Sequence, residues 1–440
     1  MDTRKFGIAP FLILTFIYFI VGFMTTINGQ FQGPLKVAFL ADAEKLRNTL
    51  TTLISFFFFL GYLVNSPLGG KWVNKRGFKT TVLRALSIMV LGVLLYALSS
   101  WMSVNYNHLI IKISNDIIPA GFIVFLLGSF MMGTSAAVLQ VVVNPYIAAY
   151  PLKGTQAVQR LNISFSFNSL ATTIAPFFVT LVVFSGVPIE NVSAAQVLMP
   201  FLLIALGVLI VTLLTRVMPL PDLEGIRNTE DKSKGHQSIW KFRHFTLGVI
   251  AIFFYVGAEV SIGVNINLHA MEILNEGVAL SFFGKNRLML GGMDMGIPAL
   301  LATLYWGGLM IGRIISGTMK NVTSKTQLIF TTVAAIILTI IAIINNNLWV
   351  LAAVGLAHSV MWGCIFTLAT SDLKEHTSRA SGVFMMGVFG GAVFPLIQGG
   401  MADLLGSWQM TWSIVIICEV VMLLYALFGS RIRTVESGIN

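Results

Sequence analysis

Amide, imidazole and indole side chains occur inside long apolar stretches of this 440-residue chain. Such groups are costly in hydrocarbon, so they usually face a cavity or a partner. Gln140 and Asn144 are four residues apart and would share one face of a helix. Amides donate and accept hydrogen bonds in fixed geometry, which suits a ligand with many hydroxyl groups. The side chains predicted to line such a cavity are Asn28, Gln140, Asn144, Asn162, Asn168, Asn265, His358 and Trp362.

Two of these positions carry a further signal. Asn144 precedes Pro145, so backbone carbonyls freed by the proline would also be available to a solute. Trp362 would offer a flat ring on which a sugar can stack. Taken singly, each of these residues is better explained by a hydrogen bond between helices or, for an aromatic residue, by a position at the membrane interface. The whole set favours a cavity, because buried polar groups are rare in membrane helices.

Glu259 is expected to be the one acid in the middle of a membrane-spanning segment. A lone carboxylate at this depth is a candidate for taking up a proton or binding Na⁺. The alternative is a structural hydrogen bond to a neighbouring helix. No metal site is expected, apart from a site for Na⁺ near Glu259.

A basic segment follows the second apolar run and reads Gly-Lys-Trp-Val-Asn-Lys-Arg-Gly-Phe-Lys from position 70. It fits the pattern G-x-x-x-[DN]-[RK]-x-G-x-[RK], which resembles the signature of the major facilitator superfamily. Gly70 would let neighbouring helices approach, and Asn74, Lys75 and Gly77 would form a contact made in one conformation and broken in another. The alternative is an ordinary basic turn.

The elements that must position these residues are membrane helices. The chain is 56% hydrophobic and 10% charged, whereas an average soluble domain has about 25% charged residues. A bilayer core needs roughly 20 apolar helical residues. The sequence predicts an all-α membrane protein with twelve spans, at 9–32, 47–70, 80–100, 117–148, 158–184, 195–218, 244–270, 297–318, 326–344, 348–371, 381–404 and 408–430.

The spans divide into six and six around a polar stretch. We expect a six-helix bundle over 1–218, a cytoplasmic linker over 219–243, and a second bundle with a short tail over 244–440. Gly61 and Gly70 of the second span are spaced like Gly308 and Gly317 of the eighth. Such a repeat is typical of transporters that bind a solute between two halves, although glycine spacings also occur in ordinary helix packing.

The net charge of +10 follows the expected topology. Most of the 28 Lys and Arg residues fall on one side if the N-terminus is cytoplasmic. This positive-inside asymmetry predicts that both termini are cytoplasmic, and it argues against a nucleic-acid partner. The expected partners are a lipid bilayer and a small solute, and the protein is expected to be monomeric.

Enzyme chemistry finds no support in the sequence. Motifs for zinc hydrolysis, for ATP binding and for a serine nucleophile are absent. Cys364 and Cys418 both lie in apolar runs and are expected to be packing residues. The protein is therefore predicted not to be an enzyme and to need no cofactor.

Four strings resemble the fucose–galactose–glucose:cation symporter family of the major facilitator superfamily, in particular its glucose/galactose branch. They are Asn144-Pro-Tyr-Ile-Ala-Ala, Arg160-Leu-Asn-Ile-Ser-Phe-Ser-Phe-Asn168, Tyr255-Val-Gly-Ala-Glu-Val-Ser-Ile-Gly263 and Leu304-Tyr-Trp-Gly-Gly-Leu-Met-Ile-Gly-Arg313. The resemblance covers nearly the whole chain. It implies a twelve-helix fold, alternating access, a bacterial inner-membrane location and hexose uptake driven by H⁺ or Na⁺.

The chain departs from the family pattern at four places. The acid that usually ends the first helix is Gly29, and Gln140 stands where fucose symporters have Glu. Phe165 replaces a Gln, and His358 replaces an Asn. Among the matched residues, Glu259 remains the main candidate for ion coupling. The departures keep two alternatives open, an uncoupled sugar facilitator and a carrier of an amino sugar or cell-wall sugar fragment. A non-transporting sensor is a further alternative from another class of function.

Overall fold

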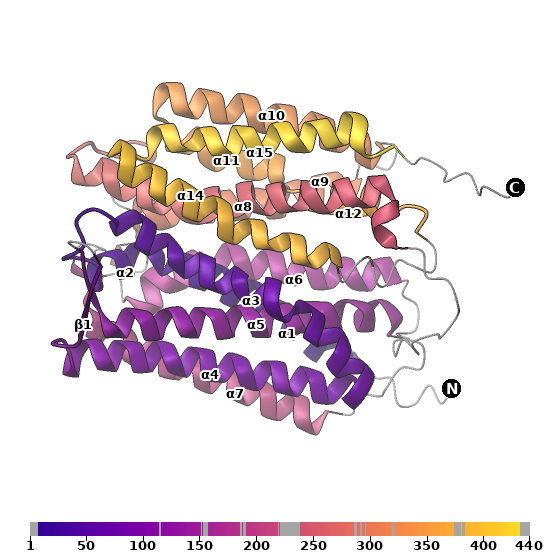
Figure 1. Cartoon of the computed structure of the whole chain (residues 1–440), viewed down its shortest axis with the longest axis horizontal. Helices are drawn as coiled ribbons and strands as arrows, with labels where there is room; N and C mark the ends of the chain where they lie inside the picture. The colour runs from indigo at the N-terminus through magenta and orange to yellow at the C-terminus, as the bar shows by residue number, and fades with distance from the viewer. Residues whose placement is uncertain are drawn as a thin grey trace, which may run out of the picture.

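The computed structural model describes residues 8–113, 116–150, 152, 157–184, 187, 191–218, 220, 238–285, 288–290, 293–294, 296–318, 322–373, 380 and 383–431. Within these residues, 12 helical segments are long and apolar enough to cross a membrane. The predicted all-α class and the predicted number of spans are therefore confirmed. The helices run roughly side by side along the long axis of the molecule (Figure 1).

The first half of the chain supplies six spans, which occupy the lower part of the view (Figure 1). A short β-hairpin, β1 (Ile110–Ile113) and β2 (Asp116–Pro119), joins the third and fourth spans. The fifth span ends in a π-helical stretch, Val179–Val183. The helices are α1 (Ile8–Gln30), α2 (Gln32–Ala38), α3 (Arg47–Arg76), α4 (Phe78–Asn105), α5 (Ala120–Ala149), α6 (Ala157–Phe178) and α7 (Leu198–Val217).

The second half supplies the other six spans, which lie above the first set (Figure 1). Strands β3 (Met289–Leu290) and β4 (Met293–Asp294) form a second hairpin. The helices are α8 (Arg243–Asn275), α9 (Ile297–Thr318), α10 (Ser324–Asn345), α11 (Leu348–His358), α12 (Met361–Thr370), α14 (Gly390–Leu405) and α15 (Ser413–Leu424). Of the expected linker 219–243, residues 219 and 221–237 lie outside the described part, and the proposed domain boundaries stay a prediction.

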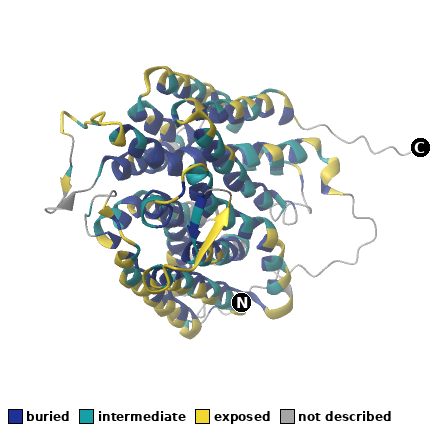
Figure 2. Ribbon diagram, turned by 60° about the vertical axis from the view of Figure 1, so that its left-hand side comes forward, coloured by how far each residue is buried: buried dark blue, intermediate teal, exposed yellow. Residues whose placement is uncertain are grey.

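Apolar side chains cover the outside of the bundle. Exposed residues lie on its rim and buried ones fill its interior (Figure 2). Val217, Phe330 and Ile344 are 84%, 74% and 73% exposed. Isolated residues of this kind are ordinary on a soluble surface, but a continuous apolar coat around polar interior groups suits lipid.

The two halves repeat one packing contact. A Cβ atom on Gly133 of α5 would stand 1.7 Å from the Phe58 carbonyl oxygen of α3, and one on Gly355 of α11 would stand 2.1 Å from the Tyr305 carbonyl oxygen of α9. Gly61 follows Phe58 by three residues, as Gly308 follows Tyr305. The second and fourth spans thus approach as closely as the eighth and tenth, at corresponding positions of the predicted repeat.

The tenth span is broken, whereas one continuous helix over 348–371 was expected. α11 ends at His358 and α12 begins at Met361. Polar side chains of neighbouring helices lie at the break: the Tyr255 hydroxyl is 3.0 Å from the His358 carbonyl oxygen, and Arg313 Nε donates to the Ser359 carbonyl oxygen at 3.1 Å. These partners lower the cost of interrupting the helix inside the membrane.

Candidate functional site

Five polar residues of the first half form a group that we call the first-half cluster: Tyr18, Tyr62, Gln140, Asn144 and Asn168. Gln140 Nε2 donates to the Tyr62 hydroxyl at 3.0 Å, and Asn168 Nδ2 donates to the Tyr18 carbonyl at 3.0 Å. The Tyr18 hydroxyl lies beside Asn144, whose Oδ1 atom is buried and has no hydrogen-bond partner in the described part of the chain. Helices α1, α3, α5 and α6 therefore bring three of the predicted amides together.

Asn168 reaches α1 because that helix has no side chain opposite it. A Cβ atom on Gly22 would stand 2.4 Å from Asn168 Nδ2. Asn168 and Gln140 both remain partly exposed, and each lies about one turn from an end of its membrane-spanning segment, Ile163–Val183 and Ala120–Asn144. Their partial exposure leaves both amides accessible to water or to a solute that enters from this end.

Five residues of the second half form the second-half cluster: Tyr255, Glu259, Tyr305, His358 and Glu419. The Tyr255 hydroxyl donates to Glu259 Oε1 at 2.8 Å, and the Tyr305 hydroxyl is 3.0 Å from the Glu259 carbonyl oxygen. His358 contacts Tyr305 through Nδ1 at 2.7 Å and Glu419 through Nε2 at 2.6 Å. One connected network thus joins α8, α9, α11 and α15.

Arg313 of α9 connects the two clusters. Its Nη1 atom donates to Ser169 Oγ of α6 at 2.6 Å, across the boundary between the halves. Its charge interacts with Glu259 on one side and with Tyr18 on the other. A guanidinium presents several donors in a rigid fork, which suits this bridging position.

An aromatic contact lies beside this bridge. The rings of Phe165 on α6 and Trp362 on α12 are 6.3 Å apart, and Tyr18 packs edge-on against Phe165 at 5.5 Å. Trp362 also stacks on Phe366 at 5.3 Å. Phe165 and Trp362 are both partly exposed, so part of each ring remains accessible to an apolar surface of a ligand.

Asn28 and Asn265 lie apart from the two clusters. Asn28 is 1% exposed; its Nδ2 donates to the Ile54 carbonyl at 3.4 Å and its Oδ1 accepts from the Tyr96 hydroxyl. All these partners belong to the first half. Asn265 donates to Gln398 Oε1 at 2.9 Å within the second half, and its own Oδ1 has no partner among the described residues. In this conformation neither amide reaches the bridge region.

The remaining predicted site residues lie in the first two turns of α6 or in the last two turns of α3, and Gly77 follows α3 directly. The side chains of Asn162 and Asn74 fall outside the described part. Gly77 ends α3 with a positive φ of 80°, a conformation that glycine adopts without strain, and Lys75 is exposed. The close approach expected at Gly70 is absent from this conformation, because no described atom lies within 4 Å of where its Cβ would stand.

The two halves are held together at one end of the bundle. We call the end that carries α2 and the start of α3 the distal end, and the opposite end, where α1 begins, the terminal end. Asp403 of α14 accepts hydrogen bonds from the Asn48 and Thr49 amides of α3 at 2.9 and 2.7 Å. Gln30 Nε2 donates to the Gly263 carbonyl at 3.1 Å, and Asn267 donates to Gln30. The distal end is therefore closed by bonds between the halves.

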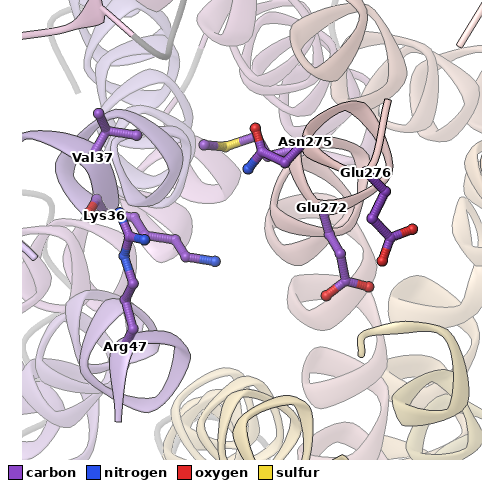
Figure 3. A pocket seen from close by; sticks show the side chains of 7 residues that line it. Lys36, Val37, Arg47, Glu272, Asn275 and Glu276 are labelled. Carbon is purple, nitrogen blue, oxygen red and sulfur yellow. Dashed lines mark hydrogen bonds between the residues drawn. The ribbon is translucent and has the colours of Figure 1, made fainter. Parts of the chain in front are cut away.

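A cavity of about 250 Å³ lies outside this closure. Lys36 and Arg47 of the first half face Glu272 and Glu276 of the second half across it (Figure 3). Glu272 accepts from the Trp408 amide at 3.0 Å, which fixes its carboxylate on the second half. The opposite charges favour contact between the halves at this end.

Three functional candidates were missed in the sequence. Glu419 is 0% exposed in the middle of α15, so the expectation that Glu259 is the one mid-span acid was wrong. The criterion that selected Glu259, an acid within an apolar run, would have selected Glu419 as well. Arg313 lies inside one of the family strings, but its contact with α6 depends on tertiary structure. Asp403 lies at the end of a predicted span, and the neighbouring sequence does not indicate which residues it bonds.

The comparisons with known proteins agree with this architecture. The Major Facilitator Superfamily profile matches residues 14–395. A glucose/galactose transporter of Brucella abortus (strain 2308) is 32% identical over 429 residues, covering 95% of this chain and 93% of the relative. An L-fucose-proton symporter of Escherichia coli (strain K12) is 23% identical, covering 97% of this chain and 94% of the relative.

Solved structures show the same fold. The fucose:proton symporter FucP in its outward conformation superposes with a TM-score of 0.65 at 21% identity, covering 96% of this chain and 99% of that chain. The inward-open E. coli xylose transporter XylE gives a TM-score of 0.68 at 14% identity, covering 98% and 97%. Together with the profile and the sequence relatives, these similarities show that the chain belongs to the major facilitator superfamily and, within it, to the fucose–galactose–glucose:cation symporter family.

Proposed function

We propose that the protein imports a hexose or a hexose derivative by cation-coupled symport with alternating access. The observation that carries this proposal is the Arg313 bridge between two polar clusters, one in each half. A solute bound between the halves touches both, so it can bind one arrangement of them better than another. That difference in affinity is what alternating access requires. The names of the sequence relatives support a sugar as the solute.

Each group has a role in this proposal. The amides of Gln140, Asn144 and Asn168 hydrogen-bond sugar hydroxyls, and Trp362 packs on the apolar face of the ring. Glu259 responds to the coupling cation, which is H⁺ or Na⁺. Asn162 completes the predicted lining, and Asn28, Asn265 and His358, which are buried and bonded within their own halves in this conformation, join it in another state. The segment with Gly70, Asn74, Lys75 and Gly77 changes its contacts between states.

In this proposal the protein lies in a bacterial inner membrane with both termini on the cytoplasmic side, as the distribution of Lys and Arg predicts. The distal end then faces the periplasm. The bonds of Asp403 and Gln30 to the opposite half close the sugar path on that side. The protein is proposed to work as a monomer, because each chain carries both halves of its own site.

Sugar counterflow in proteoliposomes tests the substrate class. Vesicles are loaded with unlabelled glucose, galactose, mannose, fucose or N-acetylglucosamine, and entry of the same labelled sugar is followed. We expect transient accumulation of at least one sugar, and protein-free vesicles provide the background. Absence of counterflow for every sugar would contradict the proposal. A response restricted to N-acetylglucosamine would favour the amino-sugar alternative. The contact between Phe165 and Trp362 supports this alternative, because an aromatic surface can pack against the acetyl group of such a sugar.

A further inference from the structure

Glu419 is a buried carboxylate with an incomplete set of partners. Its side chain is 0% exposed, and its Oε1 atom lies 2.6 Å from His358 Nε2. Its Oε2 atom has no hydrogen-bond partner in the described part of the chain. A buried charge with one partner is costly, so a group of this kind is usually retained for function.

The hydrogen bonds around His358 allow two proton counts. The Tyr305 hydroxyl contacts both His358 Nδ1, at 2.7 Å, and the Glu259 carbonyl oxygen, at 3.0 Å, but it has one hydrogen to donate. If it donates to Glu259, Nδ1 must carry a hydrogen, a second proton lies between Nε2 and Glu419, and the pair is neutral. If it donates to Nδ1, the pair holds one proton fewer and carries a negative charge.

The charged groups around the His358–Glu419 pair give its two proton counts different free energies. Glu259 is the nearest other acid, and Arg313 is the cation that interacts with it. The titratable or charged groups on the helices packed around the pair are Arg243, His244, Tyr255, Glu259, His269 and Glu272 on α8, Tyr305 and Arg313 on α9, Lys325 on α10, Cys364 on α12 and Cys418 on α15. Of the α8 groups, Tyr255 and Glu259 belong to the second-half cluster, whereas His244 contacts the Ser371 carbonyl, His269 accepts from Trp412 and Glu272 accepts from the Trp408 amide. Lys325 donates to the Leu427 carbonyl near the terminal end. Loss of a proton would therefore place a second negative charge in a network in which Arg313 is the one interacting cation among the described residues.

We propose that the Glu419–His358 pair binds a proton that is taken up together with the sugar. This inference rests on the proposed sugar symport and assigns H⁺ as a coupling ion. Uptake of the proton turns the Tyr305 hydroxyl toward the Glu259 carbonyl, so the state of a pair on α11 and α15 reaches the backbone of α8. The sugar binds the proton-loaded arrangement, in which the network is neutral apart from the Glu259 and Arg313 charges.

Two measurements on the purified full-length protein test this inference. Sugar affinity is measured from pH 5.5 to 8.5, and proton uptake on sugar addition is followed with a pH dye in weakly buffered solution. In the wild type we expect the sugar affinity to decrease as the pH rises, with a slope that approaches about tenfold per pH unit, the limit for one linked proton. We also expect addition of sugar to cause proton uptake. Glu419→Gln mimics the proton-loaded pair, so its affinity is expected to be independent of pH, without proton uptake.

His358→Gln is also expected to lose the pH dependence of sugar affinity and the proton uptake, because the pair then lacks the imidazole. Glu419→Asp keeps a carboxylate and is expected to recover proton uptake over a shifted pH range. Glu44→Gln removes an exposed acid at the distal end and serves as the matched control, with the wild-type pH dependence. If Glu419→Gln does not fold, as judged by the lack of a thermal transition, His358→Gln and Glu419→Asp decide the question.

The outcomes separate this inference from the proposed function. Wild-type proton uptake and pH dependence in Glu419→Gln or His358→Gln would overturn the inference and leave sugar symport standing. Sugar binding that depends on Na⁺ and moves no proton in the wild type would do the same. Failure of the wild type to bind any sugar would overturn the proposed function and the inference together.

Discussion

The Arg313 guanidinium on α9 donates a hydrogen bond to the Ser169 hydroxyl on α6, so a cation of the second half is bonded to the first half. The same side chain donates to the Ser359 carbonyl at the break in the tenth span. Any movement of one half against the other must lengthen or replace the bond to Ser169. Arg313 is therefore placed to sense both the relative position of the halves and the charge of Glu259.

Substitution of Arg313 tests its bridging role. We expect Arg313→Ala to lower the sugar transport rate by about tenfold or more, because hydrogen bonds of charged groups contribute roughly 1.5–3 kcal/mol each. Arg313→Lys keeps the charge without the planar fork and should recover part of the rate. Ser169→Ala removes one neutral acceptor and should have a smaller effect. Initial uptake rates in proteoliposomes measure all three, and a wild-type rate in Arg313→Ala would contradict the bridge.

The Glu259 carboxylate is expected to be required for uphill uptake. Glu259→Gln keeps the size of the side chain and its contact with Tyr255, but it removes the charge. Accumulation against a sugar gradient should be lost, while exchange of internal for external sugar should continue because exchange needs no net movement of the cation. Glu44→Gln, which removes an exposed acid at the distal end, is the control. Wild-type accumulation in Glu259→Gln would remove this residue from the coupling mechanism.

Asp403 is expected to hold the distal end closed. It accepts two backbone hydrogen bonds from the start of α3 and a third from the Thr49 hydroxyl at 2.5 Å. Asp403→Asn weakens these bonds, so the population that is open at the distal end should rise by about tenfold, the effect of roughly 1.4 kcal/mol. Labelling of a cysteine introduced at Gly33 with a membrane-impermeant maleimide measures the opening.

The design of this labelling experiment uses the native cysteines and a nearby acid. Cys364 and Cys418 are buried, so their background labelling should be low. Asp42→Asn changes an exposed acid at the same end and should leave the labelling rate unchanged. Equal labelling of Asp403→Asn and the unsubstituted protein would show that these bonds do not close the distal end.

Trp362 is expected to contribute to sugar affinity through its ring face. Trp362→Ala should raise the KM about three- to tenfold, since aromatic packing contributes roughly 0.5–1.5 kcal/mol. Trp362→Phe keeps an aromatic surface and should stay within about threefold of the wild type by the same estimate. Leu356→Ala, at an exposed position on α11, controls for loss of an apolar side chain in the same span. An unchanged KM in Trp362→Ala would place the sugar elsewhere.

Gly133 is expected to be essential for packing of α5 against α3. Its Cβ position is 1.7 Å from a backbone oxygen, so Gly133→Ala forces the two helices apart. We expect a loss of stability of about 1–3 kcal/mol or more, the usual cost of overpacking. Gly207→Ala is the matched control, because Gly207 also lies in a helix but has no described atom within 4 Å of its Cβ position. Thermal unfolding in detergent compares the two, and equal stability would contradict the close contact.

The number of spans was predictable from sequence because each span depends on local composition. A run of about 20 apolar residues forms a membrane helix with little regard to its neighbours. The pairing of Gln140 with Asn144 on one helix face was likewise predictable from their spacing. The break at Ser359 was not, because it is stabilised by Tyr255 and Arg313, which come from other helices.

The direction in which a polar side chain points was the main quantity that the sequence lacked. Asn28 turned out to bond Tyr96, 68 residues away, and Asn265 to bond Gln398, 133 residues away. In a helix that is apolar on all sides, no periodic pattern marks the face that meets the other half. The polar residues were therefore identified by type, and the sites they form required the three-dimensional packing.

Accumulation of labelled sugar in proteoliposomes under imposed ion gradients tests the central claim most directly. The sugar is the one that shows counterflow, and inward H⁺ and Na⁺ gradients are applied separately, with a matched ionophore to collapse each. The account predicts that one gradient drives the internal sugar concentration above the external one and that the ionophore abolishes this excess. Equilibration to equal concentrations under both gradients would contradict it and would identify the protein as an uncoupled sugar facilitator.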